Sequence, residues 1–272
     1  MRQHRDVRPK KSLSQNFLTD GAVAKRIADA LQPLPGECVV EIGPGTGALT
    51  KHLVDQDTRL VCIEKDVRAV EFLNREYAAR LGDRFRILEG DILETNFANL
   101  QSECPNGMSV IGNIPYAISS EILFLVFDQA QHLRSCVLMM QREVAKRLVA
   151  QPRTKDYGVL TLAAAMAAQV KILFDVKPGS FFPVPGVTSA VVRFEFRNQA
   201  PIAASVKDIR GIIRSAFAQR RKTLRNSLSG YAQTKYGVDI RSVDTPFLDK
   251  RAEELTLHDF DQLLREIQSA TT

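Results

Sequence analysis

Cys38-Val39-Val40-Glu41-Ile42-Gly43-Pro44-Gly45-Thr46-Gly47 is the stretch that decides the fold of this chain. Its first five residues predict a short buried strand, and a turn containing three glycines follows at once. Leu49 and Leu53 then recur at helical spacing. A strand, a glycine turn and a helix in this order open a nucleotide-binding half of an α/β sheet.

Apolar runs and helical periods alternate beyond this turn. Val23, Ile27 and Leu31 predict a helix before the first strand, capped by Thr19 or Asp20. Later helical periods separate four further predicted strands, at residues 60–63, 85–88, 108–113 and 136–140. Alternation of this length predicts a parallel, doubly wound sheet with right-handed crossovers.

The pattern changes after the fifth strand. An alanine-rich helix is predicted at residues 160–168, and two more strands at 170–174 and 190–196. The Pro/Gly-rich loop 177–187 joins these strands, so they predict an antiparallel hairpin at the edge of the sheet. The total is a mostly parallel sheet of seven strands.

A linker and a second domain complete the chain. Asn198-Gln199-Ala200-Pro201 predicts the linker, and helical periods dominate everything after it. We therefore divide the chain into an α/β domain at residues 1–198 and a small all-helical domain at residues 199–272.

Composition indicates an ordinary globular protein of 272 residues, with 44% hydrophobic and 25% charged residues. No apolar run reaches membrane-spanning length, and the first fifteen residues lack the apolar core of a signal peptide.

The four cysteines form no C-x-x-C pair, and Cys38, Cys62 and Cys136 lie in apolar runs, so we expect free thiols in a reducing cytoplasm. The histidines share no metal-ligand spacing, so no metal is expected. We also expect a monomer.

The net charge of +6 fits a polyanionic partner, although a solvated basic surface is the commoner explanation at this magnitude. The charge is concentrated in an N-terminal run and in one C-terminal segment. That segment contains Arg220, Arg221, Lys222 and Arg225.

The glycine turn alone does not decide between two cofactors. Gly43, Gly45 and Ala48 also match the dinucleotide pattern, and Glu64 stands where a ribose-binding acid is expected, as in an NAD-dependent oxidoreductase. However, Pro44 has no N–H to donate to a pyrophosphate, and Asp91 at the end of the third strand is placed to accept from an adenine amine. Acids and glycines without a phosphate cradle suit S-adenosylmethionine.

Asn113-Ile114-Pro115-Tyr116 at the end of the fourth strand suits the alkylation of a nucleobase amine. Such an amine is a poor nucleophile because its lone pair is delocalised. The side-chain oxygen of Asn113 and the carbonyl of Ile114 or Pro115 can each accept one N–H, and Tyr116 can stack on the base. The same four residues also suit a plain strand exit, in which Pro115 ends the strand and Tyr116 covers the core.

Six motifs in order carry a family resemblance: residues 15–18, 41–47, 64–66, 90–91, 113–116 and 181–193. From about Lys11 to Ile267 the chain resembles the small-subunit ribosomal RNA adenine N6,N6-dimethyltransferases, the dimethyladenosine transferases linked to kasugamycin sensitivity. The resemblance implies a class I Rossmann-like methyltransferase fold with a helical C-terminal domain. Its implied reaction dimethylates two adjacent adenosines of small-subunit rRNA within a pre-assembled subunit.

The resemblance also assigns residues to roles. S-adenosylmethionine is expected to bind Asn16, Leu18, Gly43, Gly45, Glu64, Lys65, Asp91, Ile92 and Asn113. The reacting adenine is expected at Asn113, Pro115, Tyr116 and Phe181, with Tyr116 and Phe181 stacking on it. Apart from the resemblance, Phe181 and Phe182 also suit the core, which is our prediction for Phe182. RNA is expected at Arg220, Arg221, Lys222 and Arg225. The chain departs from the family at Ser14, usually glycine, and at Gly186 and Thr188, usually Lys and Asp.

Three rivals to this function stay open. The large-subunit rRNA dimethyltransferases of the erythromycin-resistance type share most of the motifs. A non-catalytic ribosome-assembly or mitochondrial transcription factor can use the same fold, although intact cofactor motifs argue against lost catalysis. The NAD-dependent oxidoreductase is the third.

Overall fold

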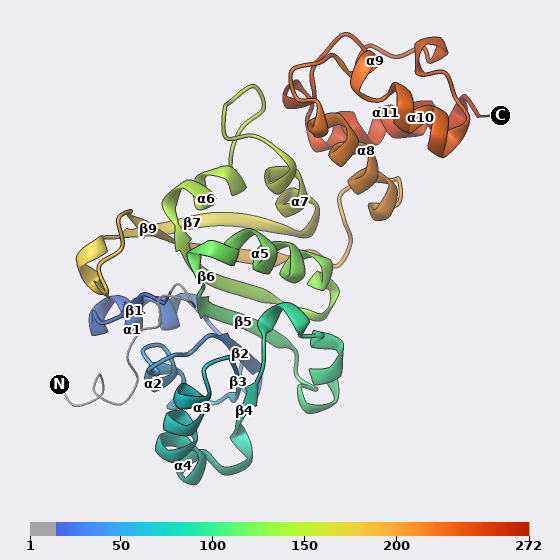
Figure 1. Cartoon of the computed structure of the whole chain (residues 1–272). Coiled ribbons are helices and arrows are strands. Elements are labelled where there is room, and N and C mark those ends of the chain that lie inside the picture. Colours follow the sequence, from blue (N-terminus) through green and yellow to red (C-terminus); the bar gives the residue numbers. More distant parts are fainter. Residues whose placement is uncertain (1–14, 272) are drawn as a thin grey trace. The chain divides into compact units, whose positions relative to one another are not determined.

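A computed structural model describes residues 15–271 of the chain (Figure 1). Ser14 and the basic N-terminal run lie outside the described residues. The described residues form two compact units, 15–145 with 168–197 and 146–167 with 198–271. The sequence prediction placed residues 146–167 in the first domain, whereas the structure groups them with the helical unit.

The first unit is built on a seven-stranded sheet in the order β4-β3-β2-β5-β6-β9-β7 (Figure 1). β2 to β6 are parallel, and β9 runs antiparallel to both β6 and β7. The predicted mostly parallel sheet with an antiparallel edge is confirmed. The strands are β2 (Cys38–Ile42), β3 (Arg59–Glu64), β4 (Phe85–Glu89), β5 (Met108–Asn113), β6 (Ser135–Gln141), β7 (Ala168–Val176) and β9 (Ser189–Phe196).

Apolar side chains project from both faces of this sheet and are covered by helices, as expected for parallel strands. On one face Val39, Cys62 and Ile111 pack in one cluster with buried residues of α1, α2 and α3. On the opposite face, Phe127 of α5 meets Phe194 edge to face, with ring centroids 5.7 Å apart. The helices are α1 (Gly21–Leu31), α2 (Thr50–Leu53), α3 (Val67–Leu73), α4 (Ala79–Leu81), α5 (Ser119–Asp128) and α6 (Arg142–Leu148).

Asp20 is the N-cap of α1. It is one of the two residues, Thr19 and Asp20, that the sequence predicted for this position. Its Oδ1 accepts hydrogen bonds from the backbone N–H groups of Ala22 and Val23, at 3.0 and 3.1 Å. The helix then buries the apolar stripe that includes Ile27 and Leu31. A side-chain cap satisfies N–H groups that the first helical turn leaves unpaired.

A small second sheet was not predicted. β1 (Phe17–Leu18) pairs antiparallel with β8 (Phe181–Phe182), inside the stretch that we predicted as an irregular loop. Thr19 strengthens the pairing, because its backbone N and its hydroxyl both donate to the carbonyl of Ser180, at 2.8 and 3.0 Å. Two-residue strands are too short to show a period of two, so the sequence pattern does not reveal them.

The second unit is helical, as predicted from its periods. It contains α7 (Val159–Ala167), α8 (Val206–Ala218), α9 (Leu224–Ser227), α10 (Ser229–Tyr236) and α11 (Leu257–Ser269). Phe217 of α8 contacts the rings of Tyr157 and Phe260, and Tyr157 Oη donates to the carbonyl of Leu255 at 2.7 Å. These contacts are the physical reason why residues 146–167 belong to this unit. In the described part of the chain, no helix is long and apolar enough to cross a bilayer.

The prediction of a free Cys38 thiol is wrong in this structure, because Cys38 and Cys104 form a disulfide, with Cα atoms 5.2 Å apart. The backbone N–H of Cys38 donates to the carbonyl of Gly107, which brings the segment of Cys104 beside the start of β2. A separation of 66 residues hides this proximity from any spacing rule. Cys62 and Cys136 are free and buried, as predicted.

Gly112 sets the close approach of β5 to β2. A Cβ at this position would lie 2.9 Å from the carbonyl oxygen of Ile42, its register partner. We expect Gly112→Ala to lower the free energy of unfolding by about 1–3 kcal/mol, since overpacking forces the backbone to shift. Thermal and urea unfolding measure this. Gly230→Ala, with no atom within 4 Å of its new Cβ, is the control and should lose no stability, because alanine favours the helix α10 more than glycine does; equal losses in both variants would contradict the prediction.

Candidate active site

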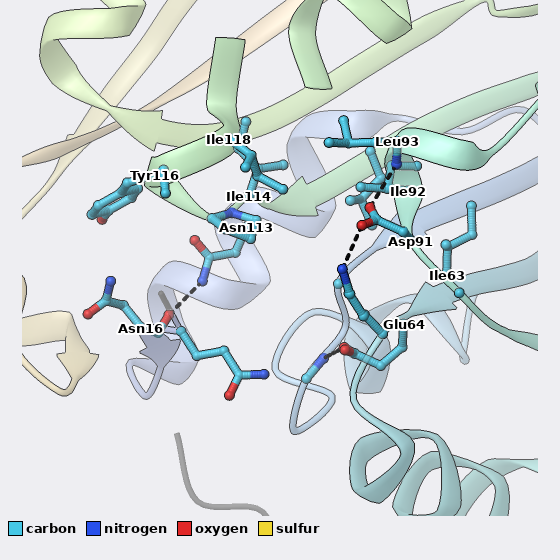
Figure 2. Close-up of a pocket in the computed structure, with 18 of the residues that line it drawn as sticks. Asn16, Ile63, Glu64, Asp91, Ile92, Leu93, Asn113, Ile114, Tyr116 and Ile118 are labelled. Atoms are coloured by element: carbon cyan, nitrogen blue, oxygen red, sulfur yellow. Dashed lines mark hydrogen bonds and ion pairs between the residues drawn. The ribbon is translucent and has the colours of Figure 1, made fainter. Parts of the chain in front are cut away.

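A cavity of about 240 Å³ opens at the carboxyl ends of β2, β3 and β5 (Figure 2). This is where open α/β sheets bind ligands. The walls come from the strand ends, from β1 and from the segments that follow β4 and β5. The lining residues are Gln15, Asn16, Phe17, Ile42, Gly43, Gly45, Ile63, Glu64, Lys65, Gly90, Asp91, Ile92, Leu93, Asn113, Ile114, Pro115, Tyr116, Ala117 and Ile118.

The glycine turn forms one wall through backbone conformations that favour glycine. Gly43, Gly45 and Gly47 have φ values of 60°, 55° and 77°. A Cβ on Gly45 would also lie 2.9 Å from the ring of Phe17. α2 begins only at Thr50 and has four residues, so no extended helix starts at this turn. The turn therefore lacks the helix N-terminus on which dinucleotide-binding folds place a pyrophosphate.

Glu64, the last residue of β3, holds the glycine turn. Its Oε2 accepts from the backbone N–H of Gly45 at 3.0 Å, and its Oε1 accepts from that of Asp66 at 2.8 Å. Burial raises the pKa of Glu64, and these hydrogen bonds act against the rise. The carboxylate thus lines the cavity and organises the backbone around it.

Asp91 lies on the wall beside Glu64 and is paired with Lys65. Lys65 Nζ donates to Asp91 Oδ2 at 2.7 Å, and the backbone N–H of Leu93 donates to Oδ1 at 3.0 Å (Figure 2). The hydrogen bond from Lys65 holds the pKa of Asp91 below its ordinary value. The carboxylate is therefore an ionised acceptor at the cavity wall.

Asn113 ends β5 with a fixed side-chain amide. Its Nδ2 donates to the carbonyl of Asn16 at 3.0 Å, which leaves the side-chain oxygen as the free end of the amide (Figure 2). Of the two backbone acceptors that the sequence left open, the carbonyl of Pro115 already accepts from Ser119 Oγ at 3.0 Å. Ile114 O accepts no hydrogen bond from the residues that the structure describes. Asn113 Oδ1 and Ile114 O are thus two acceptors without a partner among the described residues, on two residues that line the cavity.

Tyr116 closes this end of the cavity. Its Oη shares a hydrogen bond of 2.5 Å with Ser189 Oγ at the start of β9, and burial raises the pKa of the phenol. The ring is thereby tied to the edge of the sheet. A tied aromatic ring can hold a planar base in one orientation at a small cost in conformational entropy.

Two predicted site residues are not among the residues that line the cavity, and their roles in binding stay predictions. Leu18 and Phe181 are register partners in the small sheet, are 3% and 2% exposed, and pack in the core cluster. Phe17 and Gln15 line the cavity in their place. The prediction of a core position for Phe182 is wrong, because its side chain is 59% exposed instead of buried. Side chains alternate along a strand, so the unseen pairing of β1 with β8 decided which residues turn inward.

Sequence reasoning missed several apolar residues of the cavity wall. They neighbour the predicted acids and amide, and are Ile42, Ile63, Leu93, Ile114 and Ile118. The flat ring of a nucleobase binds against apolar surface. The apolar residues next to the acidic motifs in the sequence could therefore have been predicted as part of the wall.

The predicted RNA-binding run divides into two kinds of residue. Arg220 donates to Glu253 at 2.6 Å, and Arg225 pairs with Asp249 at 3.0 Å. Arg221 and Lys222 are exposed and form no ion pair with residues 15–271.

Two further cations, Lys250 and Arg251, lie beside this run and were not predicted. Thr223 forms an isolated β-bridge with Arg251, and the backbone N–H of Leu224 donates to the carbonyl of Lys250 at 2.8 Å. The helical unit therefore places four basic residues together from two segments. We call Arg221, Lys222, Lys250 and Arg251 the basic patch.

Comparison with known proteins agrees with this geometry. The family described as ribosomal RNA adenine dimethylase matches residues 7–263. The chain belongs to this family. Its full-length match confirms the resemblance drawn from the six motifs.

Relatives of this family member cover nearly its whole length. The ribosomal RNA small subunit methyltransferase A of Prosthecochloris aestuarii is 40% identical over 266 residues, which is 98% of this chain and 97% of the relative. The protein of the same name from Salinibacter ruber is 42% identical over 268 residues, covering 96% and 86%.

Solved structures agree on the fold. A dimethyladenosine transferase from Plasmodium falciparum has a TM-score of 0.78 at 25% identity, covering 93% of this chain and 98% of that one. The 23S rRNA methyltransferase ErmE has a TM-score of 0.67 at 22% identity, covering 93% and 99%, and shows the fold alone. The predicted Rossmann-like methyltransferase fold is confirmed.

Glu41 lies fully buried beneath the glycine turn of this dimethylase. Its Oε2 accepts from Thr50 Oγ1 at 2.7 Å, and burial raises the pKa of Glu41 to about 8. The folded chain therefore keeps this proton between about pH 4.5 and pH 8, where the unfolded chain has lost it. Stability that depends on this proton is lost as the pH rises through that window.

We expect Glu41→Gln to remove this part of the pH dependence, because glutamine keeps an acceptor for Thr50 without a titrating proton. The slope of unfolding free energy against pH should become less negative, by at most about 1.4 kcal/mol per pH unit. Urea unfolding at several pH values between 5 and 9 measures it. Glu71→Gln, an exposed change on α3, should keep the parental slope, and an unchanged slope in Glu41→Gln would refute the assignment.

Proposed function

We propose that this dimethylase transfers methyl groups from S-adenosylmethionine to N6 of two adjacent adenosines near the 3′ end of small-subunit rRNA. The observation that carries the proposal is that Asn113, Ile114 and Tyr116 line one cavity, where Asn113 Oδ1 and Ile114 O accept no hydrogen bond from residues 15–271. The names of the relatives support the small subunit as the source of the rRNA.

The cavity fits S-adenosylmethionine by its donor set. Glu64 and Asp91 offer carboxylate oxygens suited to ribose hydroxyls and an adenine amine, while Ile63 and Ile92 offer apolar surface. Gly43 and Gly45 keep the wall free of side chains where the methionine part is expected. Lys65, which the resemblance places among the cofactor residues, holds Asp91 in its ionised form. When bound, this cofactor supplies an electrophilic methyl group.

Asn113 and Ile114 perform the orienting work on the target amine. Each accepts one N–H, so the amine turns out of the plane of conjugation and its lone pair points away from both acceptors. The hydrogen bond from Asn113 Nδ2 to Asn16 prevents the amide from presenting a donor to the target instead. Positioning of this kind is the principal catalytic contribution of the chain.

No side chain is required as a general base, because an alkylated ammonium on an aromatic ring is acidic enough to lose its proton to water. The second transfer begins from an amine with a single N–H. One of the two acceptors then suffices, and the first methyl group occupies the space beside the other. Pro115 keeps this segment extended at the strand end, so both acceptors stay in place.

The basic patch of the helical unit is the proposed RNA contact. Arg221, Lys222 and Arg251 are exposed, and phosphate oxygens are the natural partners of exposed guanidinium and ammonium groups. Arg220 and Arg225, which the resemblance assigns to RNA, already satisfy Glu253 and Asp249. Their proposed role is to hold the two segments of the patch together.

The small-subunit assignment is favoured over the large-subunit alternative by identity. The two relatives named for the small subunit are 40% and 42% identical, whereas the large-subunit enzyme ErmE is 22% identical. A pre-assembled subunit as substrate, a monomeric state and a cytoplasmic location are further parts of the proposal that rest on the resemblance.

The cofactor is tested by calorimetry with S-adenosylmethionine and with NAD. We expect binding of the first alone, and roughly 10- to 150-fold weaker binding after Glu64→Ala, because hydrogen bonds to a charged acceptor contribute about 1.5–3 kcal/mol. Glu89→Ala, the exposed register partner of Glu64 on β4, should bind normally. Unchanged affinity in Glu64→Ala, or preference for NAD, would end the cofactor proposal.

The reacting base is tested at Tyr116 and Asn113. Tyr116→Ala should slow single-turnover methylation of unmodified small subunits by roughly 5- to 150-fold, the value of one base stack, with little change in cofactor affinity. Tyr116→Phe keeps the ring and should lose much less, while Asn113→Ala should be worse than either. Thermal melts accompany each measurement. A stable Tyr116→Ala protein with normal turnover would refute base stacking by Tyr116. Residues 113–116 would then have only the structural role of ending the strand.

The RNA contact is tested by salt dependence. Replacing Arg221 and Lys222 by Ala should reduce the slope of log affinity against log salt by about 1.4–1.8 units, for two lost phosphate contacts. Arg225→Ala is the matched control, because Arg225 is already paired with Asp249, and it should change the slope less. Filter binding of small subunits at roughly 50–300 mM salt, which brackets the physiological ionic strength, gives the slopes. Equal slopes in all three proteins would show that these basic residues face solvent and do not contact RNA.

A further inference from the structure

The side chain of Phe182 is exposed to solvent and does not contribute to the hydrophobic core. Among residues 15–271 it is the one aromatic side chain that is mostly exposed, at 59%. Its neighbour Phe181 is 2% exposed and fills the core. Leaving an aromatic ring of this size in water forgoes the stabilisation that burial would give it, so a partner is expected.

The strand register places Phe182 beside the cavity. Phe182 is directly opposite Phe17 in the antiparallel pair of β1 and β8. Paired residues point to the same face of a sheet, with Cβ atoms about 4.5–5.5 Å apart. Phe17 lines the cavity and lies against Gly45. Phe182 therefore stands at the rim, on the same side as a residue of the wall.

The loop after Phe182 is anchored at the cavity from its other end as well. Ser189, where the loop enters β9, holds the hydroxyl of Tyr116 at 2.5 Å. Between these anchors Val184 and Val187 are 65% and 45% exposed. Residues 182–189 thus border the place where the target adenine is proposed to enter.

The loop offers π and apolar surface but no cation. Residues 181–189 contain no charged side chain, and Gly186 and Thr188 stand where the resemblance implies Lys and Asp. The side chains of this loop offer a phosphate no donor except the hydroxyls of Thr188 and Ser189, and that of Ser189 already pairs with Tyr116. A nucleobase needs only a flat face, and every base presents one.

We propose that Phe182 stacks on the nucleobase next to the target adenine in the RNA strand. A base that leaves its stack to enter the cavity uncovers one face of its neighbour, and a ring at the rim replaces the lost stacking. The inference rests on the proposed function. With two adjacent target adenosines, Phe182 holds one of the pair while Tyr116 holds the other.

The test compares Phe182 variants with Val184→Ala, an equally exposed apolar change in the same loop. Methylation of unmodified small subunits under steady-state conditions gives kcat and KM separately. Phe182→Ala should raise KM for the subunit roughly 5- to 150-fold, the value of one stacked base, with cofactor affinity and melting temperature unchanged. Phe182→Trp should keep the parental KM because it keeps an aromatic face. Phe182→Leu, which is apolar but has no π face, should raise KM as Phe182→Ala does. Val184→Ala should stay within about twofold of the parent, which is less than one stacked base.

The outcomes separate this inference from the proposed function. If the parent chain methylates the subunits but Phe182→Ala behaves like Val184→Ala, stacking by Phe182 is refuted and the proposed function stands. Full rescue by Phe182→Leu would also refute it, because plain apolar contact would then suffice. If the parent chain transfers no methyl group to small subunits, both fall.

Discussion

The buried carboxylate of Glu64 is the interaction on which the site depends. One oxygen holds the N–H of Gly45 and the other holds that of Asp66, which itself caps α3. A single side chain at a strand end thus fixes the glycine turn on one side and the start of a helix on the other. Its partner acid one strand away, Glu41, is fully buried, and repulsion from Glu64 adds to the burial that raises its pKa.

The reacting end of the cavity depends on two sheets at once. Asn113 belongs to the large sheet, and Asn16, which accepts from its amide, precedes the small sheet of β1 and β8. Tyr116 is tied to β9 in a similar way through Ser189. The side chains of Asn113 and Tyr116 are therefore each held by a segment distant in sequence. Rigidity of this kind is what positioning catalysis requires, since small displacements of an acceptor misdirect the lone pair.

Much of the fold was predictable because long periodic elements carry their own signal. The seven strands, the antiparallel edge and the cap at Asp20 follow from period and composition, and Glu64, Asp91 and Asn113 follow from their places at strand ends. The exposed position of Phe182 and the buried side chains of Leu18 and Phe181 were not predictable, because a two-residue strand has no period and its register stays hidden until the pairing is seen. The ion pairs of Arg220 and Arg225 were not predictable, because their acids lie 33 and 24 residues away. Distant partners of this kind leave no local pattern.

The helical unit is discontinuous in sequence, and this has a consequence for synthesis. α7 leaves the ribosome long before α8 and α11, against which its apolar residues pack. At ordinary elongation rates the roughly 100 residues between α7 and the end of α11 take about 5–20 s to be made. During that interval Leu162, Ala163 and Met166 have no partner from the later helices. A chain that ended at the linker would therefore lack the partners that cover these apolar residues in the folded unit.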